Sequence, residues 1–469
     1  MKQFVAKLIV ILLIVAVLPI NFSFAQSNQV TYVRIGLAFG NEAVSSATLE
    51  SEDGLMIIRA VSNGFEEIMR FPDVRQVNVS IESGIVVARD VSGEMIYDHF
   101  DNDTVIAPLT FADGGLIRYN GRAYRGGICF FPTSNDRMNV INFVDLEHYI
   151  AAVVHAEISQ SSPMEALKAQ AVAARSFTVT NLGRHGSAGF DLCAGTHCQV
   201  YRGYQDEFYR TIRATNETAG LVITYNGVPV QAFYFKNSGG HTQSSEDVWG
   251  GRLPHVVGVQ DPFSPDFPWT YQVTFQTLST RLQAAGHHIG SVQSVAIRER
   301  NASGAVSVVE IIGTSGTVEL RNERFRTMLG STNVRSMMFS FGGSESTTGG
   351  GTLSYNLLLS NGHISRQIGS EDAVHIIGAN GNIEQRNIGN LYVISNGASV
   401  QLGREAQGNQ ERLEVVTSGS LTIHGMGFGH GVGMPQDSAI EKAGLGYTFE
   451  QILKFYYTGI EIRPLSALH

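Results

Sequence analysis

The first third of the chain alternates short apolar and polar stretches, a pattern typical of β-strands. The segments 30–38, 77–81, 85–89 and 116–119 are apolar or alternate with a period of two, and glycine and Asn-Gly turns separate them. We therefore expect residues 29–138 to form a small β domain. Cys129 lies in an apolar stretch of this region and is expected to be a small buried residue.

The periodicity changes at Val144, where apolar residues begin to recur at helical spacing. The apolar stripe consists of Leu146, Tyr149, Ile150, Val153 and Val154. Asp145 stands in the position of an N-cap, and Glu157 occupies the next position on the stripe. A desolvated carboxyl group has a raised pKa, which a general acid working near neutral pH requires. The alternative is a glutamate at a helix end that reaches water or pairs with a base.

A second helix is predicted to begin at Ser162, with Glu165 completing a capping box, and to stop at Gly183. Lys168 and Arg175 are seven residues apart in this helix, so they share one face. Small alanine side chains occupy most of the positions around them, which allows the helix to pack closely. The two cations either reach over a cleft or belong to a solvated basic face.

Strand patterns return after residue 200. Residues 221–225 and 230–235 flank Asn226-Gly227, which predicts a β-hairpin. Residues 448–456 are expected to form a short helix near the end of the chain. The whole pattern predicts a mixed α+β fold, mostly β, in which a helical pair carries Glu157 and packs on β structure.

The same pattern divides the chain into units. Residues 139–341 and 418–469 are expected to form the two parts of one core. Between them, residues 342–352 are a Gly/Ser/Thr-rich linker, and residues 353–417 are strand-and-turn sequence that we interpret as an inserted β module.

Composition and charge indicate where the protein works and exclude one class of partner. Residues 1–25 combine two lysines, an apolar run and small residues before a cleavage position after Ala25. They are interpreted as a signal peptide or, alternatively, an uncleaved membrane anchor, so the rest of the chain is expected to work outside the cytoplasm. The net charge of −9 argues against a nucleic-acid surface, which normally carries a basic patch.

A short segment concentrates residues that bind metals. His185, Cys193, His197 and Cys198 lie within fourteen positions in a glycine-containing loop, and their thiolates and imidazoles suit a tetrahedral zinc site. The competing interpretation is a disulfide between Cys193 and Cys198, which is natural in an exported protein.

Two glycine-rich segments offer backbone that a ligand or another strand can approach. The segment 237–242 follows a strand and combines glycine with hydroxyl groups. In the segment 424–433 glycine stands at every second position, so in a strand all glycines would lie on one face.

The motifs together resemble a known family. Residues 149–157 and 165–175 closely resemble the stage II sporulation protein D family, which includes the amidase enhancer LytB. Further similar segments are 190–193, 197–201, 238–240 and 429–434. These motifs cover about 145–270 and 421–460 in the order that the family has them.

The resemblance implies a peptidoglycan lytic transglycosylase in which Glu157 is the catalytic acid. Such an enzyme cleaves the bond between N-acetylmuramic acid and N-acetylglucosamine in glycan stripped of stem peptides, and it leaves 1,6-anhydro ends. It further implies sporulation or wall remodelling as the process, a partner cell-wall amidase, and attachment to the membrane or secretion. The rival interpretation is a wall-binding protein that stimulates an amidase without cleaving glycan.

The resemblance also assigns roles to further residues. Substrate-binding residues are expected to be Lys168, Arg175, Tyr201, Ser238, Gly239, Thr242, His430 and Gln436. Zinc ligands implied by the family are Cys193, His197 and Cys198, and we add His185 as the fourth.

Overall fold

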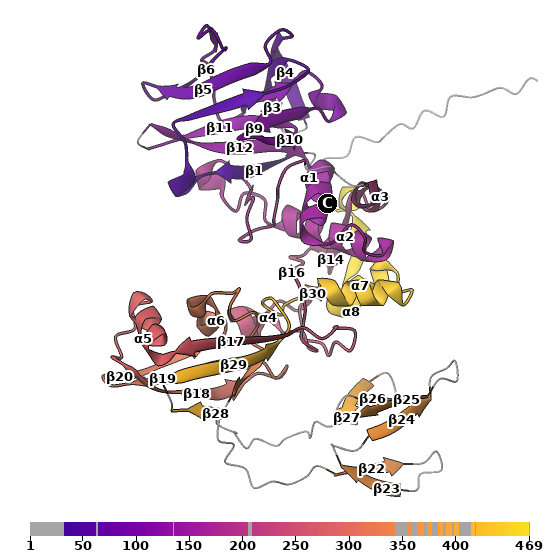
Figure 1. Cartoon of the computed structure of the whole chain (residues 1–469). Helices are drawn as coiled ribbons and strands as arrows, with labels where there is room; N and C mark the ends of the chain where they lie inside the picture. The colour runs from indigo at the N-terminus through magenta and orange to yellow at the C-terminus, as the bar shows by residue number, and fades with distance from the viewer. Residues whose placement is uncertain are drawn as a thin grey trace, which may run out of the picture.

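The computed structural model describes residues 32–61, 64–134, 136–204, 209–342, 414–417 and 419–468, together with the backbone of six short strands between 354 and 402. The fold is mixed α+β and mostly β, as the sequence predicts (Figure 1). The expected signal peptide or anchor at 1–25 lies outside the described residues. Among the helices described, none is both long and apolar enough to cross a membrane.

The N-terminal region consists of two β-sheets around a shared core. One sheet has the order β13-β1-β12-β11-β8-β3-β4 and the other β10-β9-β2-β5-β6-β7. The strands of the first are β1 (Tyr32–Ala38), β3 (Leu55–Val61), β4 (Gly64–Phe71), β8 (Thr104–Pro108), β11 (Gly127–Thr133), β12 (Arg137–Asp145) and β13 (Leu192–Cys193). Those of the second are β2 (Ser46–Glu50), β5 (Gln76–Glu82), β6 (Ile85–Arg89), β7 (Met95–Tyr97), β9 (Leu116–Tyr119) and β10 (Arg122–Arg125). The four predicted strands are thus confirmed, and Cys129 is buried in β11.

The first predicted helix is confirmed as α1 (Leu146–Glu157), which continues directly from β12. The Asp145 carboxylate caps it by accepting hydrogen bonds from the backbone N–H groups of Glu147 and His148, at 2.9 and 3.1 Å. The apolar stripe of α1 is buried in the same core as the two sheets. This packing fixes the position of the helix end, where Glu157 lies.

The second helix, α2 (Met164–Thr180), is present, but the expected capping box is wrong. Pro163 occupies the N-cap position with an extended backbone, and no side chain caps the helix. Glu165 is engaged elsewhere: it pairs with Lys168 at 3.0 Å and accepts a hydrogen bond from the backbone N–H of Phe449 at 2.8 Å. Contacts to a segment far along the chain therefore override the local capping pattern.

The C-terminal segment returns to the helical region. Helices α7 (Gln436–Gly444) and α8 (Phe449–Tyr456) pack against α2, and the strand β31 (Glu461–Pro464) pairs with β14 (Leu221–Tyr225) (Figure 1). The turn of the predicted hairpin is confirmed between β14 and β15 (Val228–Pro229), with left-handed backbone at Asn226 and Gly227, φ 51° and 79°. The expected second strand at 230–235 is wrong, because only its last two residues form a strand, β16 (Tyr234–Phe235), and this strand pairs with β30 (Met434–Pro435) instead of β14. The helix α3 (Tyr209–Glu217) covers α1 and α2.

A separate apolar core supports the second β region. Its sheets have the orders β17-β29-β21 and β20-β19-β18-β28, and helices α5 and α6 pack beside them. The elements are β17 (Pro268–Thr274), α5 (Phe275–Ala284), β18 (Val292–Arg300), β19 (Val306–Gly313), β20 (Gly316–Arg321), α6 (Arg324–Leu329), β21 (Phe339–Gly342), β28 (Glu414–Val416) and β29 (Ser420–Met426). Between β21 and β28, the short strands pair as three hairpins, β22–β23, β24–β25 and β26–β27. Their bounds are 354–358, 364–369, 373–377, 383–387, 391–395 and 398–402.

The glycine run 424–433 is not the regular strand that its alternation suggested. The strand β29 ends at Met426, and Gly427, Gly429, Gly431 and Gly433 all have positive φ. Several pack against another chain segment. A Cβ on Gly433, for example, would lie 2.0 Å from the carbonyl oxygen of Phe233. Glycine is needed here for a left-handed path and close contact rather than for one smooth strand face.

Candidate functional site

A cavity of about 710 Å³ lies at the end of α1. Segments distant in sequence form its walls: the helix end, the loop after α2, the β16 region (Tyr234–Phe235), the helix α4 (Ser245–Trp249) and the glycine run. The lining residues include Glu157, Asn181, Arg184, His197, Cys198, Val200, Gln231, Phe233, Lys236, Trp249, His430 and Gln436. Five residues implicated from the sequence therefore line one cavity: Glu157, His197, Cys198, His430 and Gln436.

Glu157 carries the carboxyl group of this cavity. Burial raises its pKa, and hydrogen bonds only partly oppose that effect. The backbone N–H of Val200 donates to Oε1 at 3.0 Å, and the Gln436 side-chain amide lies 3.5 Å from Oε2, at the long limit of a hydrogen bond. The carboxyl group is thus held in position, and its protonated form is favoured.

Glu157 is also the only carboxyl group among the described residues that line the cavity. The nearby Asp437 carboxylate is engaged with Lys236, whose Nζ lies 2.6 Å from Oδ1, and with the Asn237 amide at 3.1 Å. The cavity therefore provides one proton-exchanging carboxyl group rather than an acid and a base facing each other.

An aromatic wall borders the same cavity. Phe233 and Trp249 have ring centroids 4.5 Å apart, and the His430 ring lies 5.3 Å from both Trp249 and Phe235. Trp249 remains 45% exposed despite these contacts. Burial lowers the pKa of His430 to about 4, so its imidazole is neutral, and Nδ1 accepts the backbone N–H of Val432 at 3.0 Å. Flat apolar faces of this kind suit the C–H faces of sugar rings.

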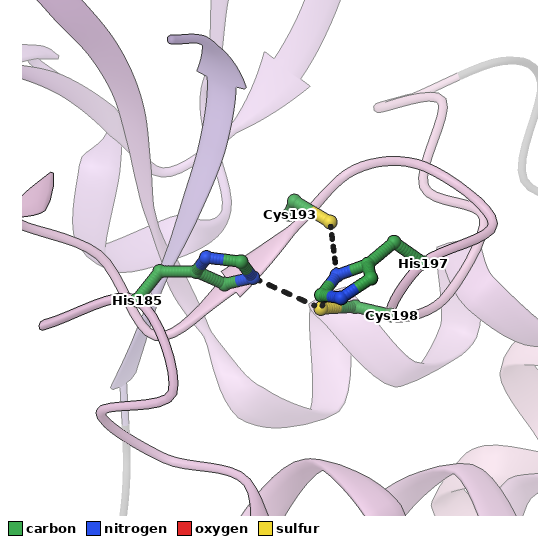
Figure 2. Close-up of side chains that lie close together, drawn as sticks. All are labelled: His185, Cys193, His197 and Cys198. Atoms are coloured by element: carbon green, nitrogen blue, oxygen red, sulfur yellow. Dashed lines mark hydrogen bonds between the residues drawn. The ribbon is translucent and has the colours of Figure 1, made fainter. Parts of the chain in front are cut away.

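The predicted metal ligands converge beside the cavity. Figure 2 shows His185, Cys193, His197 and Cys198 pointing toward one another, and their ligand atoms all lie within 4.8 Å of one another. Cys198 Sγ is 3.4 Å from His185 Nε2 and 3.5 Å from His197 Nδ1, and Cys193 Sγ is 3.6 Å from His197 Nδ1. Both cysteines are free thiols in this structure.

These donors fit a metal ion. Tetrahedral zinc with ordinary Zn–S and Zn–N bonds places neighbouring ligand atoms about 3.3–3.8 Å apart, which matches the three contacts. The contact with Cys198 lowers the pKa of Cys193 to about 4, and the same contact raises the pKa of Cys198. In the absence of a cation, two close thiols thus avoid a double negative charge, which a divalent ion would balance.

Lys168 and Arg175 do not line the cavity. Lys168 pairs with Glu165 at 3.0 Å and with Glu217 of α3 at 2.7 Å. Arg175 is fully buried and forms a two-pronged ion pair with Glu147, at 2.8 and 2.6 Å. Both cations join α2 to neighbouring helices.

The remaining predicted binding residues do not line the cavity, and all of them except the half-buried Gly239 are buried. The Tyr201 hydroxyl donates to the Asn142 side chain at 2.7 Å, and the Thr242 hydroxyl accepts the Val259 N–H at 2.8 Å. Gly239 has left-handed backbone, φ 65°, pressed against Met426. These residues therefore contact other segments of the protein instead of the cavity.

Ser238 belongs to a second polar centre, around Asp261, that sequence patterns did not indicate. The buried Asp261 carboxylate accepts hydrogen bonds from the hydroxyls of Ser238 and Ser438, each at 2.6 Å, and from Tyr456 at 3.0 Å. Nearby, Lys442 Nζ lies 3.8–3.9 Å from three aromatic ring centroids. Those rings belong to Phe263, Tyr447 and Phe455.

Sequence reasoning also missed Arg184, Lys236 and the aromatic wall. Two weak signals were available. Trp249 is one of two tryptophans in the chain, and Arg184 directly precedes the expected ligand His185. Neither signal identifies a cavity, because the walls come from segments that only the fold brings together.

Comparisons with known proteins cover the helical part and beyond. Residues 134–225 match the family model described as stage II sporulation protein, and residues 251–356 match a domain of unknown function. The first match contains α1, α2 and the metal-ligand loop, and it confirms the family resemblance predicted from the sequence.

Three relatives illustrate the similarity. An uncharacterised protein of Brachyspira hyodysenteriae is 27% identical over 346 residues, 73% of each chain. The amidase enhancer of Bacillus subtilis is 24% identical over 417 residues, which cover 85% of this chain and 51% of that protein. The stage II sporulation protein D of Bacillus subtilis is 24% identical over 341 residues, 69% of this chain and 76% of that protein.

Proposed function

We propose that this member of the stage II sporulation protein D and amidase enhancer family is a peptidoglycan lytic transglycosylase. One observation carries the proposal: Glu157, with a raised pKa, is the single carboxyl group among the described residues that line the cavity. Hydrolases that activate water on glycans generally use two carboxyl groups. A single carboxyl group suffices when the substrate itself provides the nucleophile.

The first step is proton donation. Neutral Glu157 donates its proton to the oxygen that joins N-acetylmuramic acid to N-acetylglucosamine, and the bond from that oxygen to the muramoyl C1 breaks. The electron pair of the broken bond stays with the oxygen, which leaves as a hydroxyl group. Burial of Glu157 supports this role because it keeps the proton on the carboxyl group at higher pH.

The second step closes the muramoyl sugar on itself. Its C6 hydroxyl oxygen bonds to C1, and the hydroxyl proton passes to the Glu157 carboxylate. The enzyme is regenerated, no water is consumed, and the product has a 1,6-anhydro end. The Val200 N–H and the Gln436 amide hold the carboxylate between the two steps.

The four-residue metal-ligand group is proposed to bind one structural zinc ion. Its closed set of two thiols and two imidazoles is typical of structural rather than catalytic sites. Residues 196–200 connect this group to the Val200 N–H that holds Glu157. Zinc binding would therefore stabilise the loop that positions the carboxylate.

The proposed setting is the cell wall outside the cytoplasm, in sporulation or wall remodelling, together with an amidase that removes stem peptides. The names of the relatives, stage II sporulation protein D and amidase enhancer, support this setting. The proposal includes export or membrane attachment through the N-terminal segment.

The test is the chemistry of the product. Purified protein is incubated with peptide-free glycan strands, and the products are separated and weighed by mass spectrometry. Anhydro-muramic ends, lighter by one water than hydrolytic ends, are expected. Reducing muramic ends would instead identify a hydrolase.

The rival candidate is a wall-binding enhancer that cleaves nothing, and the name of the Bacillus subtilis relative favours it. This candidate predicts intact strands in the same assay and faster release of peptides when an amidase is added. It gives the proton-donating form of Glu157 no role.

A further inference from the structure

The cavity contains several basic side chains, and most are already neutral or neutralised. Lys236 is paired with Asp437 at 2.6 Å. His430 is neutral near physiological pH because burial lowers its pKa to about 4. His197 is part of the metal-ligand group. Among the described residues that line the cavity, this leaves Arg184 as the cation without a carboxylate partner.

Arg184 is exposed but anchored at one end. Its Nη1 donates to the Asn181 side-chain oxygen at 3.1 Å. Asn181 is buried, donates to the Phe177 carbonyl at 2.8 Å and accepts from the Gln231 amide at 3.1 Å. A guanidinium has five N–H donors, so this contact leaves several directed at the cavity or at solvent.

The metal-ligand group next to Arg184 would add little net charge to this end of the cavity. If a divalent ion binds there, two thiolates balance its charge. The cationic character of this end of the cavity therefore comes from Arg184 itself.

We propose that Arg184 binds the lactyl carboxylate of N-acetylmuramic acid and so selects glycan from which the stem peptide has been removed. This inference rests on the proposed function. In peptide-bearing glycan the lactyl carbonyl is part of an uncharged amide, whereas amide hydrolysis releases a carboxylate. Arginine forms strong two-pronged hydrogen bonds with carboxylates. An amidase-type reaction must therefore supply the substrate of this site.

The test combines a change in the protein with a matched change in the ligand. Two glycan oligosaccharides are prepared, one with free lactyl carboxylates and one in which these are methylamides. Binding is measured by calorimetry in a Glu157→Gln background, which prevents turnover, with and without Arg184→Gln. Arg463→Gln, an exposed cation on β31 that pairs with Glu461, is the matched control.

We expect Arg184→Gln to weaken binding of the carboxylate form about tenfold or more and to leave the methylamide form almost unchanged. The preference for the carboxylate should also fall with rising salt, since Arg184 is exposed. The control variant should keep the full preference. Equal losses on both ligands, or no loss on either, would overturn the assignment.

The result can be separated from the proposed function. Cleavage is followed in parallel with the wild-type residue at position 157, by the appearance of anhydro ends. If anhydro ends form while Arg184→Gln shows no ligand preference change, the role of Arg184 is wrong and the reaction stands. If no cleavage occurs while the preference depends on Arg184, carboxylate recognition stands and the transglycosylase reaction is wrong.

Discussion

Among the described residues, the carboxyl groups of Asp261 and Glu157 are both withdrawn from bulk solvent, and their surroundings differ. Asp261 accepts four hydrogen bonds, from two serine hydroxyls, a tyrosine and the backbone N–H of Phe263. Glu157 has one good donor, the Val200 N–H, and one at the long limit of 3.5 Å, and it faces a cavity. Asp261 is 1% exposed and does not line the cavity.

The difference shows that burial alone does not identify a catalytic carboxyl group. Many hydrogen-bond donors hold a carboxylate in place, as around Asp261. Few donors combined with burial favour the protonated form, as at Glu157. The first arrangement suits a structural joint, and the second suits proton exchange with a substrate.

The strongest test of this contrast is Glu157→Gln. We expect a loss of about 10²–10⁴-fold in the rate of anhydro-end formation, because general acid catalysis contributes about that much. In thermal unfolding at neutral pH the variant should be at least as stable as the wild type. A variant that forms anhydro ends at the wild-type rate would show that another group donates the proton.

Asp261→Asn should have the opposite profile. It removes charge-assisted hydrogen bonds from three hydroxyls in a buried site, so we expect the free energy of unfolding to fall by about 3 kcal/mol or more. Urea titration measures this loss. Asp98→Asn, at an exposed position, is the control and should change stability little. The contrast fails if Asp261→Asn unfolds like the wild type but loses activity.

Metal removal should affect stability before chemistry. Zinc at a hundred times its dissociation constant adds about 2.7 kcal/mol, which corresponds to roughly 5–10 °C in Tm. We therefore expect chelation, Cys198→Ser or His185→Ala to lower Tm by that amount, with elemental analysis reporting the lost ion. His99→Ala, whose side chain is 84% exposed, is the control. Metal-free protein with Cys193 and Cys198 oxidised would replace the metal site with a disulfide.

Substitutions of the two basic residues of α2 compare the effect of breaking a buried ion pair with that of breaking a half-buried one. Breaking the Arg175–Glu147 pair with Arg175→Ala should cost about 3–5 kcal/mol, since it leaves a carboxylate uncompensated. Lys168→Ala should cost about 1 kcal/mol or less. Neither should alter KM for glycan in the folded enzyme. An increase in KM for either variant, with normal stability, would return that residue to the substrate site.

The pH dependence of stability gives the smallest and most specific effect. The pKa of Glu157 is raised in the folded protein, so its contribution to stability is fully present below its unfolded pKa, about 4.3, and is lost as pH rises through the folded pKa. Glu157→Gln cannot ionise and lacks this loss. The variant should therefore gain stability relative to the wild type between pH 4 and pH 7.5, as measured by thermal unfolding. A pH-independent difference would contradict a raised pKa.

Local patterns predicted the elements of the fold where local interactions decide them. The Asp145 cap, the apolar stripe that leads to Glu157 and the Asn226-Gly227 turn were all legible in sequence. Ser162 and Glu165 misled, because Glu165 contacts Phe449, 284 positions away. The glycine run misled for a similar reason, since its positive φ values accommodate segments around Gly239 and Phe233.

The candidate site was predictable only in part. Family motifs indicated Glu157 and three of the candidate metal ligands, Cys193, His197 and Cys198. His185 was added from its position in the same loop, and the fold brings the four candidate ligands together. They could not distinguish the buried ion pair of Arg175 from a ligand contact, because both require an arginine on a helix of small residues. The aromatic wall and Arg184 depend on tertiary packing and left no periodic signal.

Residues that are far apart in the amino-acid sequence line the cavity together. Glu157 and Gln436 are 279 positions apart, and the last wall, around His430, belongs to the final forty residues. A chain synthesised from its N-terminus can fold its β domain and α1 early, yet the site is incomplete until the segment around His430 and Gln436 has also been synthesised. Glu157 is therefore synthesised well before the segments that complete the cavity in which it can meet a substrate.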